Sequence, residues 1–431
     1  MNIGFLYGRN KLHLEVPDDT TVFASKFPEP ENTEAETVLQ SVRKPIATKS
    51  LAESLKGCKG NVAVVVSDIT RPIPYTRFLP ELMHEIESAK ISKRKIVIII
   101  ATGMHRPSTE EERVEMFGKD IVDRYRIVDH KAEDEATLIE LPGKSWSGAK
   151  VRINREFAEA EFKIITGLVE PHFMAGFSGG RKAVCPGLVS LETVKQFHGY
   201  EFLSSPLSCN GNLKGNSCHL ESTSIAKLAG VDFSVNVVLN NERKLVRAFS
   251  GKLEESHVNA CKFVSSCSCP EVETEADIAV TSCGGYPLDA TFYQCVKGMV
   301  SCIPAVKRNG IIISLGSCLE GIGSPEYQST MEKYSGRWRD YIMDIQIPGH
   351  FIKDQWQFQM QSRALEKVGE KNLHFITHGI EQKILSRLSV NGSSAGEDEI
   401  KQSFRKIFDS CFKEGMKVAV FPEGPYCAPR N

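Results

Sequence analysis

The sequence predicts an α/β protein of two domains with mostly parallel sheets, and three observations support this prediction. With 431 residues, the chain is longer than one hydrophobic core usually supports. Continuous apolar runs at 61–67, 95–101 and 162–169 are typical of buried parallel strands. A second alternation of strand-like and helical patterns begins after residue 274. Such alternation is the pattern of parallel sheets covered by helices.

The N-terminal part opens with residues 2–17, which alternate apolar and polar around a Gly-Arg-Asn turn and predict a β-hairpin. Residues 28–60 are polar, with a helix expected near 48–56, and 204–222 form an expected loop rich in Ser, Asn and Gly. The other predicted elements are strand 61–67, helix 76–90, strand 95–101, a helix opened by a capping box from Ser108 to Glu111, strands 126–128 and 162–169, a short helix from Ser190 to His198, a hairpin at 235–249 and a helix at 252–266.

The boundary between the domains is predicted at residues 265–274, a linker-like segment. The N-terminal domain then covers residues 1–268 and a smaller C-terminal domain covers 275–431, with the option that the last residues pack back onto the N-terminal domain. The predicted elements of the C-terminal domain are strand 277–282, helix 290–302, strand 310–315, helices between 325 and 370, strand 372–376, helix 398–414 and strand 417–421.

Composition excludes several classes of partner. The 53 basic and 54 acidic residues nearly cancel, so no basic face for nucleic acid is expected. The first residues lack the features of a signal peptide, and no apolar run is long enough to span a bilayer. Thirteen scattered cysteines indicate reduced thiols. These features predict a cytoplasmic protein without a membrane partner.

Three of the predicted strands are each followed by a polar loop. The loops are Asp68-Ile-Thr-Arg71-Pro72, the TGMHRP segment at 102–107, and the EPHFMAGFSGGRK segment at 170–182. Ligand sites in open α/β sheets form outside the carboxyl ends of the strands. The three loops can therefore meet at one crevice.

The glycine cluster around Gly179 and Gly180 invites comparison with a phosphate loop. Arg181 separates Gly180 from Lys182, so the pattern is not a Walker A motif, and nucleotide hydrolysis is disfavoured. Glycine amides and two cations could still hold a phosphate or carboxylate. The alternative is a tight turn with solvated cations.

Three histidines are candidates for chemistry. His105 and His172 each follow an apolar strand, where acid–base work and a structural role are about equally expected. His198 ends a predicted helix, a position that the helix dipole also favours for histidine. The histidines show no HxH or HxxxH spacing, so a metal here would take most of its ligands from outside the protein.

Other candidates are weaker on their own. Arg71 could clamp a carboxylate through its guanidinium group, or it could be a surface arginine fixed by Pro72. Tyr293, Gln294 and Lys297 can share one face at the start of a helix, or simply be solvated there. Trp356 could serve only in packing.

Taken together, these motifs resemble the lactate racemase family, whose enzymes use a nickel-pincer nucleotide. The resemblance runs over nearly the full length. It is carried by six segments, which are Asp68-Ile-Thr-Arg71-Pro72, Gly103-Met104-His105-Arg106-Pro107, Pro171-His172, Gly179-Gly180-Arg181-Lys182, His198 and Tyr293-Gln294-x-x-Lys297. It implies two α/β domains with the active site in the cleft between them.

The resemblance also implies a cofactor, a pyridinium-3-thioamide-5-thiocarboxylate mononucleotide that carries nickel. Lys182 matches the lysine that joins it covalently, and His198 matches the protein ligand to nickel. Two sulfurs and a ring carbon of the cofactor supply the other donors, so one histidine suffices. The other residues expected beside the cofactor are Asp68, Gly179, Gly180 and Trp356. Proteins of cofactor biosynthesis are expected as partners.

For the substrate, the resemblance implies a small 2-hydroxy acid, either lactate or a related hydroxy or sugar acid. His105 and His172 match the paired acid–base residues, and Arg71 and Lys297 match the groups that hold the carboxylate. Tyr293 and Gln294 are expected to line the substrate site. The implied reaction is racemisation or epimerisation by reversible hydride transfer at C2, with the nickel centre as hydride acceptor.

Two alternatives stay open from the sequence. A nicotinamide-dependent dehydrogenase of a hydroxy acid would fit the fold, but G-x-G-x-x-G does not follow the first strong strand. A non-catalytic nickel- or nucleotide-binding protein could use the same cleft. The presence of both His105 and His172 favours chemistry over carriage.

Overall fold

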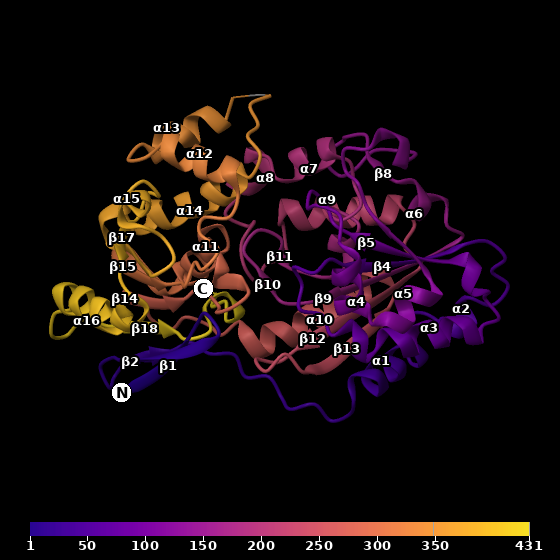
Figure 1. The fold of residues 1–431 in the computed structure, drawn as a ribbon, viewed down its shortest axis with the longest axis horizontal. Coiled ribbons are helices and arrows are strands. Elements are labelled where there is room, and N and C mark those ends of the chain that lie inside the picture. The colour runs from indigo at the N-terminus through magenta and orange to yellow at the C-terminus, as the bar shows by residue number, and fades with distance from the viewer. Residues whose placement is uncertain (348, 431) are drawn as a thin grey trace.

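The computed structural model describes residues 1–347 and 349–430 and contains two six-stranded sheets. In the first sheet every neighbouring pair of strands is parallel except β12 and β13, which form an antiparallel hairpin. The strand order is β13 (Leu245–Gly251), β12 (Phe233–Leu239), β9 (Phe162–Leu168), β4 (Val62–Ser67), β5 (Ile96–Ala101) and β6 (Arg126–Asp129). This sheet lies in the indigo-to-magenta half of Figure 1.

Both faces of the first sheet are buried, as the continuous apolar runs predict. Along β4, Val62, Val64 and Val66 pack into one core, whereas Ala63 and Val65 pack into the core on the opposite face. The helices of this half are α1 (Glu34–Arg43), α2 (Leu51–Ser54), α3 (Leu79–Ser88), α4 (Glu110–Phe117), α5 (Lys119–Arg124), α6 (Arg155–Glu159), α7 (Leu191–Phe197), α8 (Tyr200–Ser204), α9 (Ser217–Leu228) and α10 (Leu253–Ser268). Two short antiparallel pairs, β7 (Leu138–Glu140) with β8 (Arg152–Asn154) and β10 (Pro171–His172) with β11 (Gly176–Phe177), complete it.

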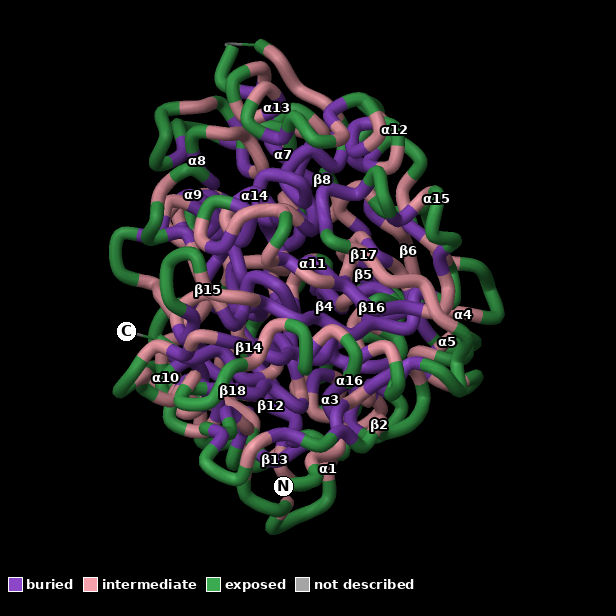
Figure 2. Tube along the Cα trace, turned by 90° about the vertical axis from the view of Figure 1, so that its left-hand side faces the viewer, coloured by how far each residue is buried: buried purple, intermediate pink, exposed green. Residues whose placement is uncertain are grey.

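The second sheet is parallel throughout. Its order is β17 (Asn391–Ser394), β16 (Leu373–Thr377), β15 (Val306–Leu315), β14 (Ala276–Ser282), β18 (Val418–Phe421) and β3 (Thr21–Val22). The helices beside it are α11 (Phe292–Ser301), α12 (Pro325–Lys333), α13 (Trp338–Ile345), α14 (Gln355–Val368), α15 (Gln382–Leu385) and α16 (Ile400–Cys411). Figure 2 shows buried segments running through both halves of the molecule. The predicted fold class, α/β with two mostly parallel sheets, is confirmed.

Each end of the chain packs against the half of the molecule that is formed by the other end. The predicted N-terminal hairpin exists as β1 (Asn2–Tyr7) and β2 (Asn10–Glu15), and its Phe5 packs with Val280 and Val420 of the second sheet. The hairpin forms its own two-stranded sheet beside the second sheet, and β3 joins the second sheet by pairing with β18, although these residues fall in the predicted N-terminal domain. At the other end, Ala428 packs with Val169 and Phe177 beside the first sheet. The division into 1–268 and 275–431 stays a prediction.

Three local predictions are wrong. Helix α1 falls in the stretch expected to be polar coil, because it buries only Val38 and Val42 and therefore leaves little apolar pattern. Helix α9 occupies part of the expected loop 204–222, since the side chains that it buries include polar ones. The capping box before α4 joins Thr109 to Glu112, one residue later than expected.

Among the described residues, no helix is both long enough and apolar enough to cross a bilayer.

Candidate active site

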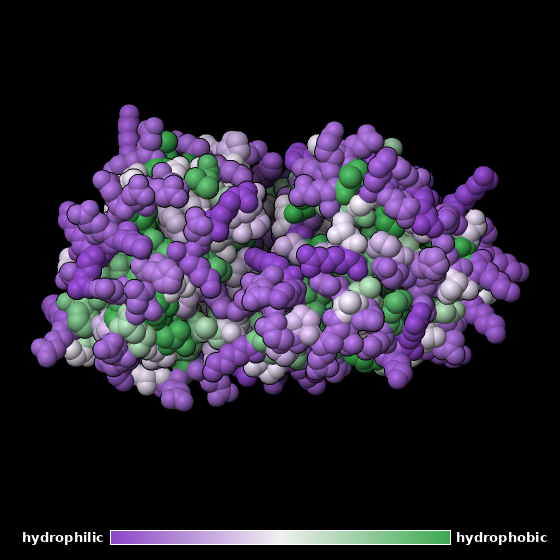
Figure 3. Space-filling model, turned by 60° about the horizontal axis from the view of Figure 1, so that its bottom comes forward, coloured by the Kyte–Doolittle hydropathy of each residue, from purple (hydrophilic) through white to green (hydrophobic). Residues whose placement is uncertain are grey.

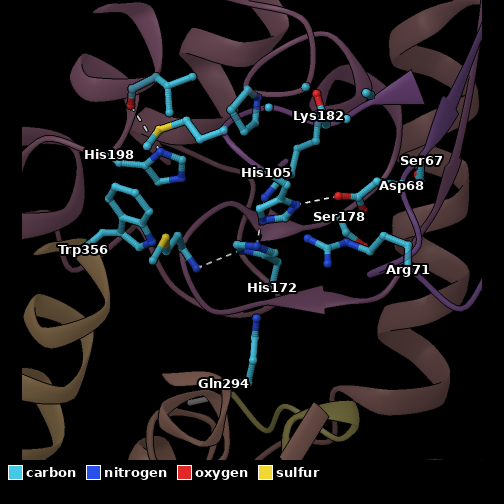
Figure 4. Close-up of a pocket in the computed structure, with 18 of the residues that line it drawn as sticks. Ser67, Asp68, Arg71, His105, His172, Ser178, Lys182, His198, Gln294 and Trp356 are labelled. Atoms are coloured by element: carbon cyan, nitrogen blue, oxygen red, sulfur yellow. Dashed lines mark hydrogen bonds and ion pairs between the residues drawn. The ribbon is translucent and has the colours of Figure 1, made fainter. Parts of the chain in front are cut away.

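A cleft of about 410 Å³ lies between the two sheets and is lined from both sides. Figure 3 shows the molecule hollowed between its two halves, and Figure 4 shows the side chains that converge there. Of the residues predicted for the site, all but one line this cleft: Asp68, Arg71, His105, His172, Gly179, Lys182, His198, Tyr293, Gln294, Lys297 and Trp356. Gly180 is the exception.

The predicted meeting of the three polar loops follows directly from the sheet order. Strands β9, β4 and β5 are neighbours and parallel, so their carboxyl ends lie at one edge. Asp68 follows β4, His105 lies four residues beyond β5, and His172 lies four residues beyond β9. In Figure 4, His105 and His172 occupy the centre of the pocket, with Asp68 and Arg71 to one side.

His105 is oriented by a buried carboxylate. Its Nδ1 lies 2.5 Å from Oδ2 of Asp68, and the other oxygen of Asp68 accepts the hydroxyl hydrogen of Thr70 at 2.6 Å. Burial raises the pKa of Asp68, but the hydrogen bond from His105 and the charges of His105 and Arg71 outweigh it and hold the pKa below its usual value. The ionised carboxylate keeps the proton of His105 on Nδ1. Nε2 is therefore left with a lone pair that can accept a proton.

His172 is held in the opposite tautomer by the backbone. The N–H groups of Met174 and Ala175 both point at its Nδ1, each at 3.2 Å. Because backbone N–H groups can only donate, Nδ1 accepts, and the proton of the neutral ring lies on Nε2. That Nε2 is 2.8 Å from Nζ of Lys182. The histidine thus donates to the lysine, which can accept only as a neutral amine.

The electrostatics of this pair agree with the hydrogen bonds. Burial lowers the pKa of Lys182 well below its usual value, and the charges of Arg71 and Arg181 lower it further. Burial is also the main cause that holds the pKa of His172 well below its usual value. An uncharged lysine amine is a nucleophile, so Lys182 is ready to form a covalent bond.

The two adjacent glycines of the glycine-rich loop differ, because Gly179 lines the cleft and Gly180 does not. The N–H of Gly180 donates to the side-chain oxygen of Asn236 at 2.9 Å. Gly180 does not line the cleft, and its contact with a cofactor stays a prediction. Gly180 has φ of 50°, and a Cβ there would lie 2.6 Å from the ring of His257. Its absence of a side chain thus serves packing.

Arg181 also differs from expectation, because it does not face the cleft. Its side chain is 1% exposed and donates to the carbonyl oxygens of Ala175 and Phe177, at 2.7 and 2.9 Å. It therefore fixes the loop that carries His172 and Lys182. Of the two adjacent cations, only Lys182 reaches the cleft.

His198 ends α7 and is prepared to bind a metal. Its Nδ1 donates to the carbonyl oxygen of Val194 at 3.2 Å, which leaves the lone pair of Nε2 free. Burial lowers its pKa to about 3, so the ring stays neutral at physiological pH. The ring stacks on Trp356 with centroids 4.4 Å apart. Figure 4 shows the two rings side by side at one end of the pocket.

The second half of the molecule contributes α11. Lys297 is half-buried, and desolvation followed by repulsion from Arg71 lowers its pKa to about 7, although Glu170 acts in the opposite direction. Within the described chain, no carboxylate forms a salt bridge with Lys297. The buried Oε1 of Gln294 likewise has no hydrogen-bond partner among the described residues. A half-buried cation and a buried unpaired amide oxygen in one cleft indicate a polar ligand site.

A hydrogen-bonded chain that the sequence analysis missed links α11 to α14. Trp356 donates its indole N–H to the hydroxyl of Tyr293 at 2.8 Å, and this hydroxyl donates to Asp354 at 3.2 Å. Asp354 also accepts from Ser324 at 2.5 Å. The chain orients Trp356 against His198. Asp354 lies inside the stretch predicted as helices between 325 and 370, where no sequence pattern singles it out.

The protein alone does not provide a complete metal site. Among the residues that the structure describes, no three His, Cys, Asp or Glu side chains are grouped so that they could hold a metal ion. A metal bound by His198 would need its other ligands from a second molecule.

The fold and the cleft define a two-domain α/β enzyme whose reactive groups come from both halves of the chain. Models of the lactate racemase N-terminal domain and the lactate racemase C-terminal domain match residues 7–211 and 272–425. The chain belongs to the lactate racemase family. It is 34% identical to a lactate racemase of Thermoanaerobacterium thermosaccharolyticum over 437 residues, 98% of either protein. A lactate racemase of Lactiplantibacillus plantarum is 34% identical over 394 residues, 91% of this chain and 90% of that protein.

Solved structures agree with this assignment. The lactate racemase apoprotein from Thermoanaerobacterium thermosaccharolyticum superimposes with a TM-score of 0.90 at 33% identity, over 100% of both chains. A Thermotoga maritima protein with 17% identity superimposes with a TM-score of 0.69 over 94% of this chain and 100% of that one. The second likeness concerns the fold alone.

Proposed function

We propose that the protein is a racemase or epimerase of a small 2-hydroxy acid, lactate or a related hydroxy or sugar acid. The observation that carries this proposal is the grouping in one cleft of a neutral lysine amine, a metal-ready histidine and two further histidines in opposite tautomers. The two relatives named lactate racemase support the same reaction class.

The residues present fit a nickel-pincer nucleotide. His198 offers one imidazole lone pair, and the described residues hold no group of three metal-binding side chains. A metal on His198 would therefore take its remaining donors from the cofactor. The neutral amine of Lys182 is suited to a covalent tether. When bound, the cofactor would supply the chemistry that accepts and returns hydride at C2 of the substrate. Proteins that make and deliver the cofactor are the partners that this proposal requires.

The paired histidines would handle the hydroxyl proton. The lone pair on Nε2 of His105 can take the proton as the hydroxyl becomes a carbonyl, while Asp68 stabilises the imidazolium that forms. The Nε2–H of His172 can donate to the same oxygen from another direction. One base and one hydrogen-bond donor thus flank the substrate oxygen, and reversal at the other face requires them to exchange roles.

The substrate carboxylate would lie between Arg71 and Lys297. Both side chains line the cleft, one from each half of the molecule, and the charge of Arg71 adds to burial in lowering the pKa of Lys297. A bound carboxylate relieves that repulsion. Two anchors from different halves also fix the substrate while its C2 centre changes geometry.

The test is chiral chromatography of a panel of single-enantiomer 2-hydroxy acids with protein produced alongside the cofactor-biosynthesis proteins. Wild type should interconvert the enantiomers of at least one acid without added nicotinamide cofactor. His105→Asn and His172→Asn should each slow this by about 10²–10⁴. His13→Asn, at an exposed position of the hairpin, is the matched control. If both cleft variants kept the rate of the control, His105 and His172 would not be the acid–base pair. If loaded wild type interconverted no acid, the protein would be a carrier and not a racemase.

A further inference from the structure

A second cavity, of about 420 Å³, lies between the N-terminal hairpin, the β12–β13 turn and the C-terminal segment. Its walls include Arg9, Lys11, Glu170, Arg243 and Tyr286. Its size matches that of the active cleft, about 410 Å³. None of the residues proposed above for catalysis or cofactor attachment lines it.

A narrow space of about 50 Å³ lies between this cavity and the active cleft. It shares four wall residues with the cleft, which are Arg71, His172, Phe173 and Lys297. It shares another four with the outer cavity, which are Glu170, Pro171, Arg243 and Tyr426. At roughly 10–15 Å³ for each water, the space can hold several water molecules. The three spaces therefore adjoin one another through shared walls, and the narrow space reaches the proposed carboxylate anchors.

The narrow space is bounded by groups from both halves of the molecule. Arg243, in the β12–β13 turn, donates to the hydroxyl of Tyr426 at 2.6 Å and lies 4.7 Å from the centre of its ring. Tyr426 belongs to the short 3-10 helix η9 (Gly424–Tyr426) of the C-terminal segment. A change in the angle between the halves would therefore widen or close the space.

Positive charge predominates along the outer cavity and the narrow space. Arg9 and Lys11 line the outer cavity, Arg243 lines both it and the narrow space, and Arg71 and Lys297 lie at the inner end. Two carboxylates line the same walls, Glu170 and Glu423. Glu423 is already engaged, because it accepts the backbone N–H of Ser25 at 3.1 Å. Five cations against two carboxylates favour a small anion.

We propose that the outer cavity and the narrow space form an access route for the substrate, a small carboxylate anion, that is separate from the mouth of the active cleft. This inference rests on the proposed function. The active cleft has the volume of a site for a single ligand, about 300–1,000 Å³. A nucleotide bound there would fill much of it, and a small anion would then need another entrance. Arg243 holds the anion on its way to Arg71 and Lys297.

The first test fills the narrow space at Leu288, which lines it but does not line the active cleft. In loaded protein, Leu288→Trp should lower kcat/KM for the racemised acid about tenfold, because association becomes slower. Leu288→Ala, the matched control, should keep kcat/KM at or above the wild-type value. Nickel content and intact mass should be unchanged in both variants. Equal kcat/KM in Leu288→Trp, Leu288→Ala and wild type would overturn the route.

The second test does not depend on racemase activity. Crystals of the protein without cofactor are soaked in sodium bromide, and anomalous scattering locates the ion. Bromide beside Arg243 in the narrow space supports the route, and bromide confined to the active cleft or the outer surface overturns it. If loaded wild type racemised no acid while bromide bound beside Arg243, the proposed function would fail and the anion site would stand.

Discussion

The half-buried lysine of α11, Lys297, gives the sharpest test of how the cleft binds its substrate. Lys297 has a pKa of about 7, set by burial and by repulsion from Arg71. With that pKa, the empty site carries the ammonium charge in about half of the molecules at pH 7, a tenth at pH 8 and a hundredth at pH 9. Only the protonated form attracts the carboxylate, which stays ionised throughout this range.

The sign follows from this titration. As pH rises above 7, the protonated fraction falls, and kcat/KM should fall by up to about tenfold for each pH unit. Arg71 keeps its charge and limits the loss. The assay is the pH profile of kcat/KM between pH 6 and 9 in protein of known nickel content.

The matched variant is Lys297→Arg, because a guanidinium group stays protonated across the range. It should lose the alkaline fall while keeping a measurable reaction. If Lys297→Arg showed the same alkaline fall as wild type, the titrating group would be another one, and the assignment of Lys297 as the carboxylate anchor would lose its support.

Three further changes have defined outcomes. Asp68→Asn removes the ionised partner of His105 and should lower kcat about 10²–10⁴-fold at unchanged nickel content, whereas a wild-type kcat would show that the contact is not used. His198→Ala should reduce the nickel retained after desalting, measured by metal analysis, by about tenfold or more, and full retention would contradict the ligand assignment. His130, whose buried ring donates to Val189, has a pKa of about 4 against the usual 6.5, so its contribution to stability is present above pH 6.5 and is lost as pH falls towards 4. His130→Gln should therefore remove about 2 kcal/mol from the difference in unfolding free energy between pH 7 and pH 4.5, measured by urea titration, and an unchanged difference would count against a neutral buried ring.

Much of the site could be anticipated from the sequence because it depends on strand ends. The apolar runs that became β4, β5 and β9 mark buried parallel strands, and each is followed at once by its polar residues. Adjacent parallel strands bring those residues together without further information. Asp68, His105 and His172 therefore meet as expected.

Other features depend on contacts between distant segments. Arg181 and Lys182 are neighbours in a glycine-rich loop, and only the fold decides that one is buried against carbonyl groups while the other faces the cleft. The contact between Asp354 and Tyr293 joins residues 61 positions apart. The pairing of β3 with β18 joins the two ends of the chain. Local patterns carry no signal for such pairings.

The tautomers of His105 and His172 also could not be predicted from the sequence. The motifs identify His105 and His172 as equivalent candidates. The structure separates them, because a carboxylate faces Nδ1 of the first and two backbone N–H groups face Nδ1 of the second. Their different starting states follow from these partners alone.

The central claim, a nucleotide tethered to Lys182 with nickel on His198, is tested most directly by the intact mass and nickel content of the protein. Both are measured after production with and without the cofactor-biosynthesis proteins, for wild type and for Lys182→Ala. We expect a covalent mass increase and bound nickel only in wild type made with those proteins. The same mass increase in Lys182→Ala, or racemase activity in wild type of unmodified mass, would contradict the claim.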